Sequence, residues 1–410
     1  MQITRLELEN FRGFEKFEID LHPEMTLLVG ENGSGKSALI DALAFAAAKQ
    51  LQGLPVAQMP DPATRDRRVS VRTVGGVPTL EPERPLRIEW TGTFLGKAYG
   101  LRWIDGQDGR DWARAFPAGI DLRNRVTAGE PLPLPLIARL EASKGWERNP
   151  RAGEVQPANR LAGYSDWHSP RASQTQLVSW LRKYTFVELQ EKAPAPHLRA
   201  VVRAIRDAVP GTIDVGFNVR ADEVWVTFEG DRIVPFSLLS DGYRSMVALV
   251  ADLAWRAAVL NPQLEDRAAR ETEGIVLIDE IELHLHPRWQ RQVLGALRRA
   301  FPKLQFVVTT HSPQVIASAK REWVRLLDGT STAKTPEFVE GRDPNGILED
   351  IFGVSGRPEE TLDRIRTIFE AVDRGDVSGA RAILEELEAV LGPDDPDMVR
   401  ARWMLDVEAA

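Results

Sequence analysis

The feature that most constrains this chain is a glycine-rich segment between a short apolar run and a helical pattern. The segment reads Gly30-Glu31-Asn32-Gly33-Ser34-Gly35-Lys36-Ser37, which matches G-x-x-x-x-G-K-[ST]. Residues 25–29 before it are continuously apolar or β-branched, which predicts a buried strand, and a helix is expected over about 36–50. Glycines in such a turn let backbone N–H groups and a helix N-terminus face phosphate oxygens. The segment therefore predicts an α/β fold with a nucleotide site at a strand end.

Two side chains of this segment have specific expected roles. Lys36 is expected to reach the β- and γ-phosphates, and the Ser37 hydroxyl is expected to coordinate Mg²⁺. The predicted ligands are therefore ATP and Mg²⁺.

A second strand pattern ends in two carboxylates. Residues 275–278 are Ile-Val-Leu-Ile, and Asp279 and Glu280 follow directly. Asp279 is expected in the Mg²⁺ shell, directly or through water. Glu280 is expected to act as the general base on the attacking water. Solvated acids at a strand end are common, but beside a phosphate loop this pair indicates a catalytic centre.

A histidine follows the next apolar strand, in Thr309-Thr310-His311-Ser312-Pro313. Ligands of open α/β folds bind at the carboxyl ends of strands, so His311 is expected to sense the γ-phosphate and position the lytic water. Another segment, 238–244, places Ser240, Asp241 and Gly242 before a helix expected over about 243–260. A serine and a glycine at a helix N-terminus form an anion site, although the same residues also serve as an ordinary helix cap.

The rest of the chain is read from its periodicity. An antiparallel ribbon is expected over 1–21, and further strands over 69–74, 86–94, 97–104, 134–138, 213–219 and 223–228. Helices are expected over 174–208, 288–300, 346–353, 357–373, 376–391 and 396–408, with 105–175 mostly irregular. Four parts follow: an N-terminal lobe with a β-subdomain (1–104), an irregular and helical insertion (105–212), a C-terminal lobe (213–340) and a helical tail (341–410).

Composition excludes several classes of protein. The 410 residues contain no cysteine, which rules out disulfides, thiolate metal sites and a thiol nucleophile. No apolar run approaches the ~20 residues of a spanning helix, and the N-terminus lacks a signal-peptide pattern, so a cytoplasmic protein without a membrane contact is expected. The net charge of -8 argues against a chain that coats nucleic acid non-specifically, but it allows a local basic groove.

Taken in order, the four motifs resemble those of the ABC-type ATPases in their RecF/SMC-like branch. The opening 6–14, Leu-Glu-Leu-Glu-Asn-Phe-Arg-Gly-Phe, is similar to the N-terminal ribbon of that branch. The resemblance implies an ATPase head with a mixed central sheet, an N-terminal antiparallel β-subdomain, a helical insertion or lid, and a helical tail. It also implies a head-to-tail dimer in which Ser240 of the signature segment closes the ATP site of the other copy. It places Arg12 near the nucleotide, and the glutamine of the family's Q-loop has no clear counterpart.

Departures from the general pattern narrow the branch. The signature reads Ser-Asp-Gly-Tyr-Arg, no heptad pattern long enough for a coiled-coil arm is found, and residues 281–287 are similar to the overcoming-lysogenization-defect ATPases. The helical pattern after Pro313 predicts that no nuclease domain is appended. Residues 235–244 and 343–350 resemble the stand-alone group that includes PtuA, the ATPase of Septu anti-phage systems and of some retrons. That resemblance implies anti-phage defence with a separate HNH nuclease as partner, and DNA contact through the complex.

Alternatives remain open at this stage. The chain is expected to regulate a nuclease, but it could instead be a RecF-like DNA-repair or DNA-binding ATPase that acts alone, or a structural ATPase that uses ATP to hold an oligomer. His284 and His286 could be a metal pair, although a loop role without metal is favoured. Trp146, Trp167 and Trp180 could stack on bases, although packing is favoured. The tail helices are expected to serve docking or oligomerisation rather than catalysis.

Overall fold

The structure is a computed structural model. It describes residues 1–51, 54, 62, 64–74, 77–106, 116–141, 160–168, 174–192, 195–283 and 285–408. The chain divides into two compact units, Met1–Arg342 and Asp343–Ala410. Each unit is described by itself.

A five-stranded sheet carries the predicted site strands in the first unit. Its order is β14-β3-β13-β12-β8, and every neighbouring pair is parallel. The strands are β3 (Met25–Gly30), β8 (Leu136–Glu141), β12 (Gly274–Asp279), β13 (Leu304–Thr310) and β14 (Val324–Leu327). Every residue of β3, β12 and β13 is buried, as their unbroken apolar runs predict for central parallel strands. The α/β fold class is confirmed, but the expected mixed central sheet is wrong, because the antiparallel strands form a sheet of their own.

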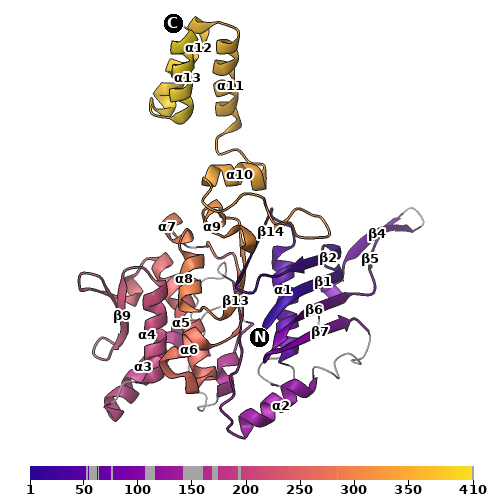
Figure 1. Ribbon diagram of the computed structural model, residues 1–410, viewed down its shortest axis with the longest axis vertical. Coiled ribbons are helices and arrows are strands. Elements are labelled where there is room, and N and C mark those ends of the chain that lie inside the picture. The colour runs from indigo at the N-terminus through magenta and orange to yellow at the C-terminus, as the bar shows by residue number, and fades with distance from the viewer. Residues whose placement is uncertain are drawn as a thin grey trace. The chain divides into compact units, whose positions relative to one another are not determined.

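That second sheet has the order β2-β1-β6-β7 and is antiparallel throughout. Its strands are β1 (Gln2–Phe11), β2 (Phe14–Asp20), β6 (Arg87–Phe94) and β7 (Lys97–Ile104), which confirms the predicted N-terminal β-subdomain. Helix α1 (Lys36–Gln50) lies beside this sheet and contacts strands of both sheets (Figure 1). Its buried residues surround the helix, as expected of a helix that is covered on more than one side.

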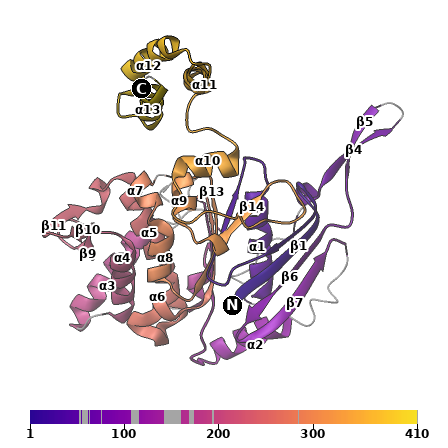
Figure 2. The same cartoon turned by 45° about the horizontal axis from the view of Figure 1, so that its top comes forward.

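Most of the other helices of this unit gather on the opposite side of the parallel sheet from α1, as Figure 2 shows. They are α3 (Gln174–Glu191), α4 (Pro196–Ala208), α5 (Asp241–Leu260), α6 (Ala268–Glu271), α7 (Pro287–Gln290), α8 (Val293–Ala300) and α9 (Pro313–Ala317). The stretch 174–208, expected to be helical, contains the two helices α3 and α4, and Ala195 is extended before Pro196, as residues before proline prefer. The helix expected over 288–300 is also divided, into α7 and α8, and it makes the predicted crossover between parallel β12 and β13.

Smaller elements complete the unit. A three-stranded antiparallel sheet contains β9 (Thr212–Asn218), β10 (Glu223–Phe228) and β11 (Arg232–Pro235), so the predicted hairpin has a third strand. A hairpin of β4 (Val69–Val74) and β5 (Val77–Pro82) projects from the unit (Figures 1 and 2), and α2 (Phe116–Thr127) lies in the stretch expected to be irregular. Trp167 and Trp180 are buried, which confirms packing roles, whereas Trp146 lies outside the described residues. Within the described ranges, no helix has the length and apolar character needed to cross a bilayer.

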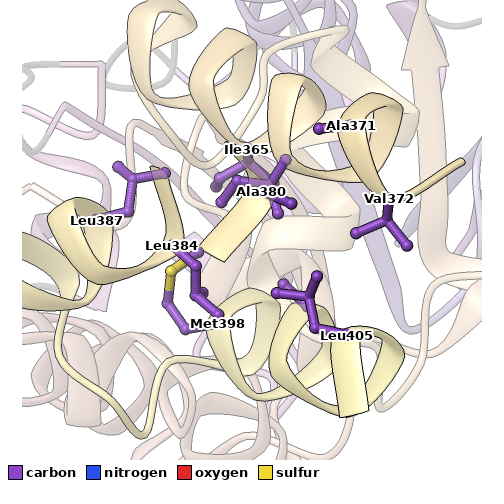
Figure 3. Packing of buried hydrophobic residues seen from close by; sticks show 10 residues of the cluster. Ile365, Ala371, Val372, Ala380, Leu384, Leu387, Met398 and Leu405 are labelled. Carbon is purple, nitrogen blue, oxygen red and sulfur yellow. The ribbon is translucent and has the colours of Figure 1, made fainter. Parts of the chain in front are cut away.

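The second unit is helical, as predicted. It contains α10 (Pro344–Phe352), α11 (Glu359–Asp373), α12 (Val377–Leu391) and α13 (Pro396–Glu408). The last three helices enclose an apolar core that includes Ile365 and Met398 (Figure 3). The predicted face of α12 is buried in that core at Ala380, Leu384 and Leu387. Asp376 caps α12 by accepting a hydrogen bond from the Gly379 N–H at 2.9 Å.

Candidate nucleotide site

The predicted phosphate loop joins β3 to α1, as the sequence pattern requires. Gly33 and Gly35 have φ values of 84° and 97°, a left-handed backbone that glycine adopts without strain. The loop is closed by a hydrogen bond from the Ser34 N–H to the Glu31 carbonyl at 3.2 Å. Glu31 and Asn32 are exposed at its tip, and Ser37 is exposed at the start of α1. The loop thus presents backbone and a helix N-terminus to solvent, the arrangement that accepts phosphate.

Neighbouring elements hold the loop on two sides. A β-carbon on Gly35 would lie 2.3 Å from Cζ of Phe14, which follows the turn of the β1–β2 ribbon. A β-carbon on Gly30 would lie 2.6 Å from the carbonyl oxygen of Leu327, at the end of β14. Close packing therefore requires glycine at both positions, and at Gly35 the left-handed backbone requires it as well.

Lys36 is folded back over the loop. Its Nζ donates to the carbonyls of Gly30 at 2.9 Å and Glu31 at 2.8 Å, and the residue is 6% exposed. Burial lowers the pKa of Lys36 because the ammonium loses its hydration, while nearby carboxylates led by Asp279 act in the opposite direction. A phosphate group at this position would add a further negative charge beside the ammonium. The residues present therefore fit a nucleotide phosphate.

The end of β12 is tied to β13 by one hydroxyl. Thr309 Oγ1 donates to Oδ1 of Asp279 and accepts the Glu280 N–H at 2.8 Å. Glu280 has φ 57°, an uncommon conformation for a residue with a side chain, at the point where the chain leaves the sheet. The Thr309 hydroxyl thus accepts the Glu280 N–H in place of a carbonyl on the neighbouring strand, and it fixes the orientation of the Glu280 peptide group.

A magnesium ion is implied by these motifs. Ser37 and Asp279 offer the oxygen ligands that Mg²⁺ prefers, and Asp279 is 8% exposed. Among the residues that the structure describes, no cluster of three or more His, Asp or Glu side chains could hold a metal. Mg²⁺ is usually held by one or two protein groups together with substrate phosphates and water.

His311 follows β13, at the carboxyl edge of the sheet where it was expected. Its backbone N–H donates to Oε1 of Glu282 at 2.5 Å. The pKa of His311 is lowered, first by burial and next by the positive charge of Lys36, while Glu282 and Asp279 oppose the shift. Lys36, His311 and Asp279 stand at the carboxyl ends of the adjacent parallel strands β3, β13 and β12, which brings the three groups to one edge of the sheet.

The side chain of Arg12 is engaged by two carboxylates. The residue has φ 50°, and its guanidinium pairs with Asp41 of α1 at 2.6 Å and with Asp66 at 2.8 Å. Asp41 also pairs with Arg139 of β8 at 2.6 Å. The turn of the ribbon reaches the phosphate loop through Phe14, while the Arg12 side chain is engaged by these carboxylates. Its contact with a nucleotide stays a prediction.

The signature segment begins α5. Ser240 is the N-cap residue, but its hydroxyl makes no capping hydrogen bond, and both Ser240 and Asp241 are exposed. Arg244 forms an ion pair with Asp241 and a hydrogen bond to the Ser237 carbonyl at 3.4 Å. Gly242 follows in the first turn of the helix. The segment thus presents an uncapped, exposed N-terminus of a 20-residue helix.

His286 has a structural role. Its ring Nδ1 accepts the Arg288 N–H at 3.3 Å and so caps α7. This agrees with the reading of this histidine as part of a loop, while His284 lies outside the described residues.

Sequence reasoning assigned no role to Thr309, Glu282 or Gln290. Thr309 stands in the His311 motif, Glu282 lies within the segment 281–287, and Gln290 follows that segment by three residues, so closeness to these motifs was the available signal. Their contacts form only when the ends of β12 and β13 come together in the folded sheet.

Comparisons with known proteins agree with this geometry. A family model described as "AAA domain, putative AbiEii toxin, Type IV TA system" matches residues 122–317, and one described as "AAA domain" matches residues 5–76. The "Retron Ec83 probable ATPase" of Escherichia coli is 24% identical over 100% of this chain and 87% of its own length.

Two further relatives match over shorter stretches. The "Septu protein PtuA" of Bacillus thuringiensis is 26% identical over 39% of this chain and 43% of its own length. The "DNA replication and repair protein RecF" of Colwellia psychrerythraea is 49% identical over 11% of this chain and 12% of its own length. Together with the phosphate loop, the acidic strand end and the histidine strand end, these matches show that the chain is similar to ABC-type ATPases of the RecF/SMC-like branch, among them the PtuA and retron ATPases.

Proposed function

We propose that two copies of this ATPase close head to tail around ATP and that the cycle of closure and hydrolysis regulates a partner HNH nuclease in anti-phage defence. In each site, Lys36 and the backbone of residues 30–37 hold the phosphates, and Ser37 and Asp279 hold Mg²⁺. Glu280 activates the attacking water, and His311 senses the γ-phosphate. Ser240, Asp241 and Gly242 of the other copy complete the site, and Arg12 lies beside the nucleotide.

The observation that carries the dimer is the unused N-terminus of α5. The Ser240 hydroxyl makes no capping hydrogen bond, and the segment is exposed at the start of a 20-residue helix. Such a terminus attracts an anion through its free N–H groups and its dipole. A γ-phosphate bound on the loop of a second copy is an anion of the right kind.

The defence role rests on the names of the relatives, and the HNH nuclease partner rests on the resemblance of residues 235–244 and 343–350 to the PtuA group. The relatives are named for retron and Septu systems, and the chain spans 87% of the retron Ec83 ATPase but 43% of the PtuA of Bacillus thuringiensis. The action on DNA is assigned to the partner, which agrees with the net charge of -8 on this chain. We place the ATPase and its nuclease partner in the cytoplasm.

Native mass of the purified chain with and without ATP and Mg²⁺ tests the dimer. ATP should increase the mass, and the Ser240→Arg variant should bind nucleotide without that increase. A mixture of Ser240→Arg with Lys36→Ala should regain part of the hydrolysis rate, because one of the two sites in such a dimer is intact. No recovery in a mixture that does associate would contradict shared sites.

Co-purification with an HNH protein encoded beside this chain tests the partner. The complex should cut DNA in a manner that depends on nucleotide, and the Glu280→Gln variant should alter that dependence. Equal DNA cutting with and without nucleotide, and by the parent and Glu280→Gln complexes, would contradict regulation of the nuclease.

The short match to RecF supports a second candidate, a DNA-binding ATPase that acts without a nuclease. That function predicts ATP-dependent binding of DNA by the chain alone. The logarithm of its affinity should fall linearly with the logarithm of salt concentration, because phosphate contacts release counterions. Binding that requires the HNH protein would favour the first candidate.

A further inference from the structure

The backbone that carries His311 is held from two directions by the segment that follows Glu280. From one side, Glu282 Oε1 accepts the His311 N–H at 2.5 Å. From the other, Gln290 Oε1 accepts the Ser312 hydroxyl at 2.7 Å. Glu282 and Gln290 thus hold His311 and Ser312, the two residues that follow β13. We call these two hydrogen bonds the clasp.

Gln290 also fixes the loop from which Glu282 comes. Its Nε2 donates to the Leu285 carbonyl at 2.9 Å and to the Glu282 carbonyl at 3.4 Å. The Gln290 side-chain amide thus bonds to both segments. Its oxygen accepts from Ser312, next to His311, and its nitrogen donates to the loop that carries Glu282. Gln290 is partly buried at the last residue of α7. These bonds are consequently less exposed to competition by water than surface contacts are.

The clasp is connected to the acidic end of β12. Thr309 Oγ1 accepts the Glu280 N–H at 2.8 Å, and the Ile281 N–H donates to the Thr309 carbonyl at 3.2 Å. Hydrogen bonds through Thr309 and Glu282 therefore connect the peptide groups of Glu280 and His311. A hydrolytic site needs this kind of support, because a displacement of about 1 Å can cost on the order of a hundredfold in rate.

We propose that Glu282 and Gln290 are positioning residues that hold the His311 loop in register with Glu280 for ATP hydrolysis. This inference rests on the proposed roles of Glu280 and His311. Gln290 would act through hydrogen bonds to Ser312 and to the 282–285 loop, without touching nucleotide. Its loss should therefore slow hydrolysis and leave nucleotide binding intact.

The decisive variant is Gln290→Met, which keeps the length of the side chain and removes all of its hydrogen bonds. We expect kcat to fall about tenfold, with the KM for ATP and the affinity for ATP within about twofold of the parent. The Gln290→Glu variant keeps the oxygen that accepts from Ser312 but loses the N–H groups that donate to the 282–285 loop. The kcat of this variant should therefore also be lower than that of the parent. Gln290→Glu carries the test if Gln290→Met does not fold.

Two further measurements separate positioning from general support of the fold. Ser312→Ala removes the same bond from the other side, together with the side-chain cap of α9. Because the two residues share one bond, the double variant with Gln290→Met should still lose less than the product of the single losses. The matched control is Gln314→Ala, which removes an exposed contact from Arg291 to Gln314 between the same part of the chain and α9. That variant should keep kcat within about twofold of the parent.

An unchanged kcat in Gln290→Met would overturn the proposal, as would a loss of ATP affinity that parallels the loss of rate. Equal losses of kcat in Gln290→Met and Gln314→Ala would also overturn it, because both would then act only through the packing of α7 and α9. Failure of the site assignment itself looks different. In that case Glu280→Gln would hydrolyse ATP at the parent rate, whatever Gln290→Met does.

Discussion

The ring of Phe14 occupies the space that a β-carbon on Gly35 would need, 2.3 Å from Cζ. This contact joins the N-terminal ribbon to the last glycine of the phosphate loop. Gly35 also has φ 97°, so two independent constraints act on one position. The ribbon is therefore part of the support of the nucleotide site.

Gly35→Ala should weaken ATP binding by more than about tenfold, because it combines backbone strain of about 1–2 kcal/mol with a collision. Gly33→Ala is the matched comparison, since it has a similar φ of 84° and no atom within 4 Å of the added carbon. Titration with a fluorescent ATP analogue measures both affinities. Phe14→Ala in the Gly35→Ala background should recover part of the loss, and equal effects at the two glycines would show that the ring is irrelevant.

Lys36→Ala and Glu280→Gln should separate binding from hydrolysis. Lys36 is the buried cation of the loop, so its loss should abolish measurable ATP binding. Glu280→Gln should retain ATP, slow hydrolysis by about 10²–10⁴-fold and accumulate the closed dimer. Phosphate release and native mass with ATP are the readouts. Hydrolysis by Glu280→Gln at the parent rate would reject Glu280 as the general base.

Arg256→Ala should be strongly destabilising, by about 3–5 kcal/mol. Arg256 pairs with Asp252 at 2.8 Å within α5, with both side chains buried, and donates to the carbonyls of Gly163 and Ser165. Its removal leaves a buried carboxylate and two carbonyls without their donor. Urea denaturation followed by tryptophan fluorescence gives the change in the free energy of unfolding.

A surface pair provides the control for that measurement. Arg203 lies 3.7 Å from Asp266, and both side chains are substantially exposed, so Arg203→Ala should cost less than about 1 kcal/mol. The double variant Asp252→Leu with Arg256→Met should be more stable than Arg256→Ala, because no buried charge remains. Similar costs for Arg203→Ala and Arg256→Ala would show that burial of the ion pair has no energetic weight.

Acidification should destabilise the fold through its histidines. Burial is the largest cause of the lowered pKa values of His22, His197 and His311. In the unfolded chain these groups titrate near their ordinary pKa of about 6.5, so the unfolded state binds more protons as pH falls. Their contribution is present above that pH and is lost as pH falls through the lower folded values. Urea denaturation at several pH values should show this loss, and His197→Gln should reduce it, whereas an unchanged profile would contradict a role for His197.

Much of the fold followed from local patterns. The continuous apolar runs predicted β3, β12 and β13, and alternation predicted the β1–β2 ribbon. The single helix expected over 288–300 is interrupted at Arg291 and Gln292. The predicted mixed sheet is instead a parallel sheet beside an antiparallel one, because strand direction and partner depend on contacts between distant segments.

The sequence by itself determined the chemistry of this protein. Glycine spacing, one lysine and the acids after an apolar strand are local requirements for holding phosphate, so they can be read without a structure. Only the tertiary structure decided how that chemistry is supported. Thr309 between Asp279 and Glu280, and the clasp on His311, join residues that the adjacent strands β12 and β13 bring together. Phe14 against Gly35 joins a strand of the antiparallel sheet to the phosphate loop. Such contacts leave no periodic trace in the chain, because they arise from strand order and packing.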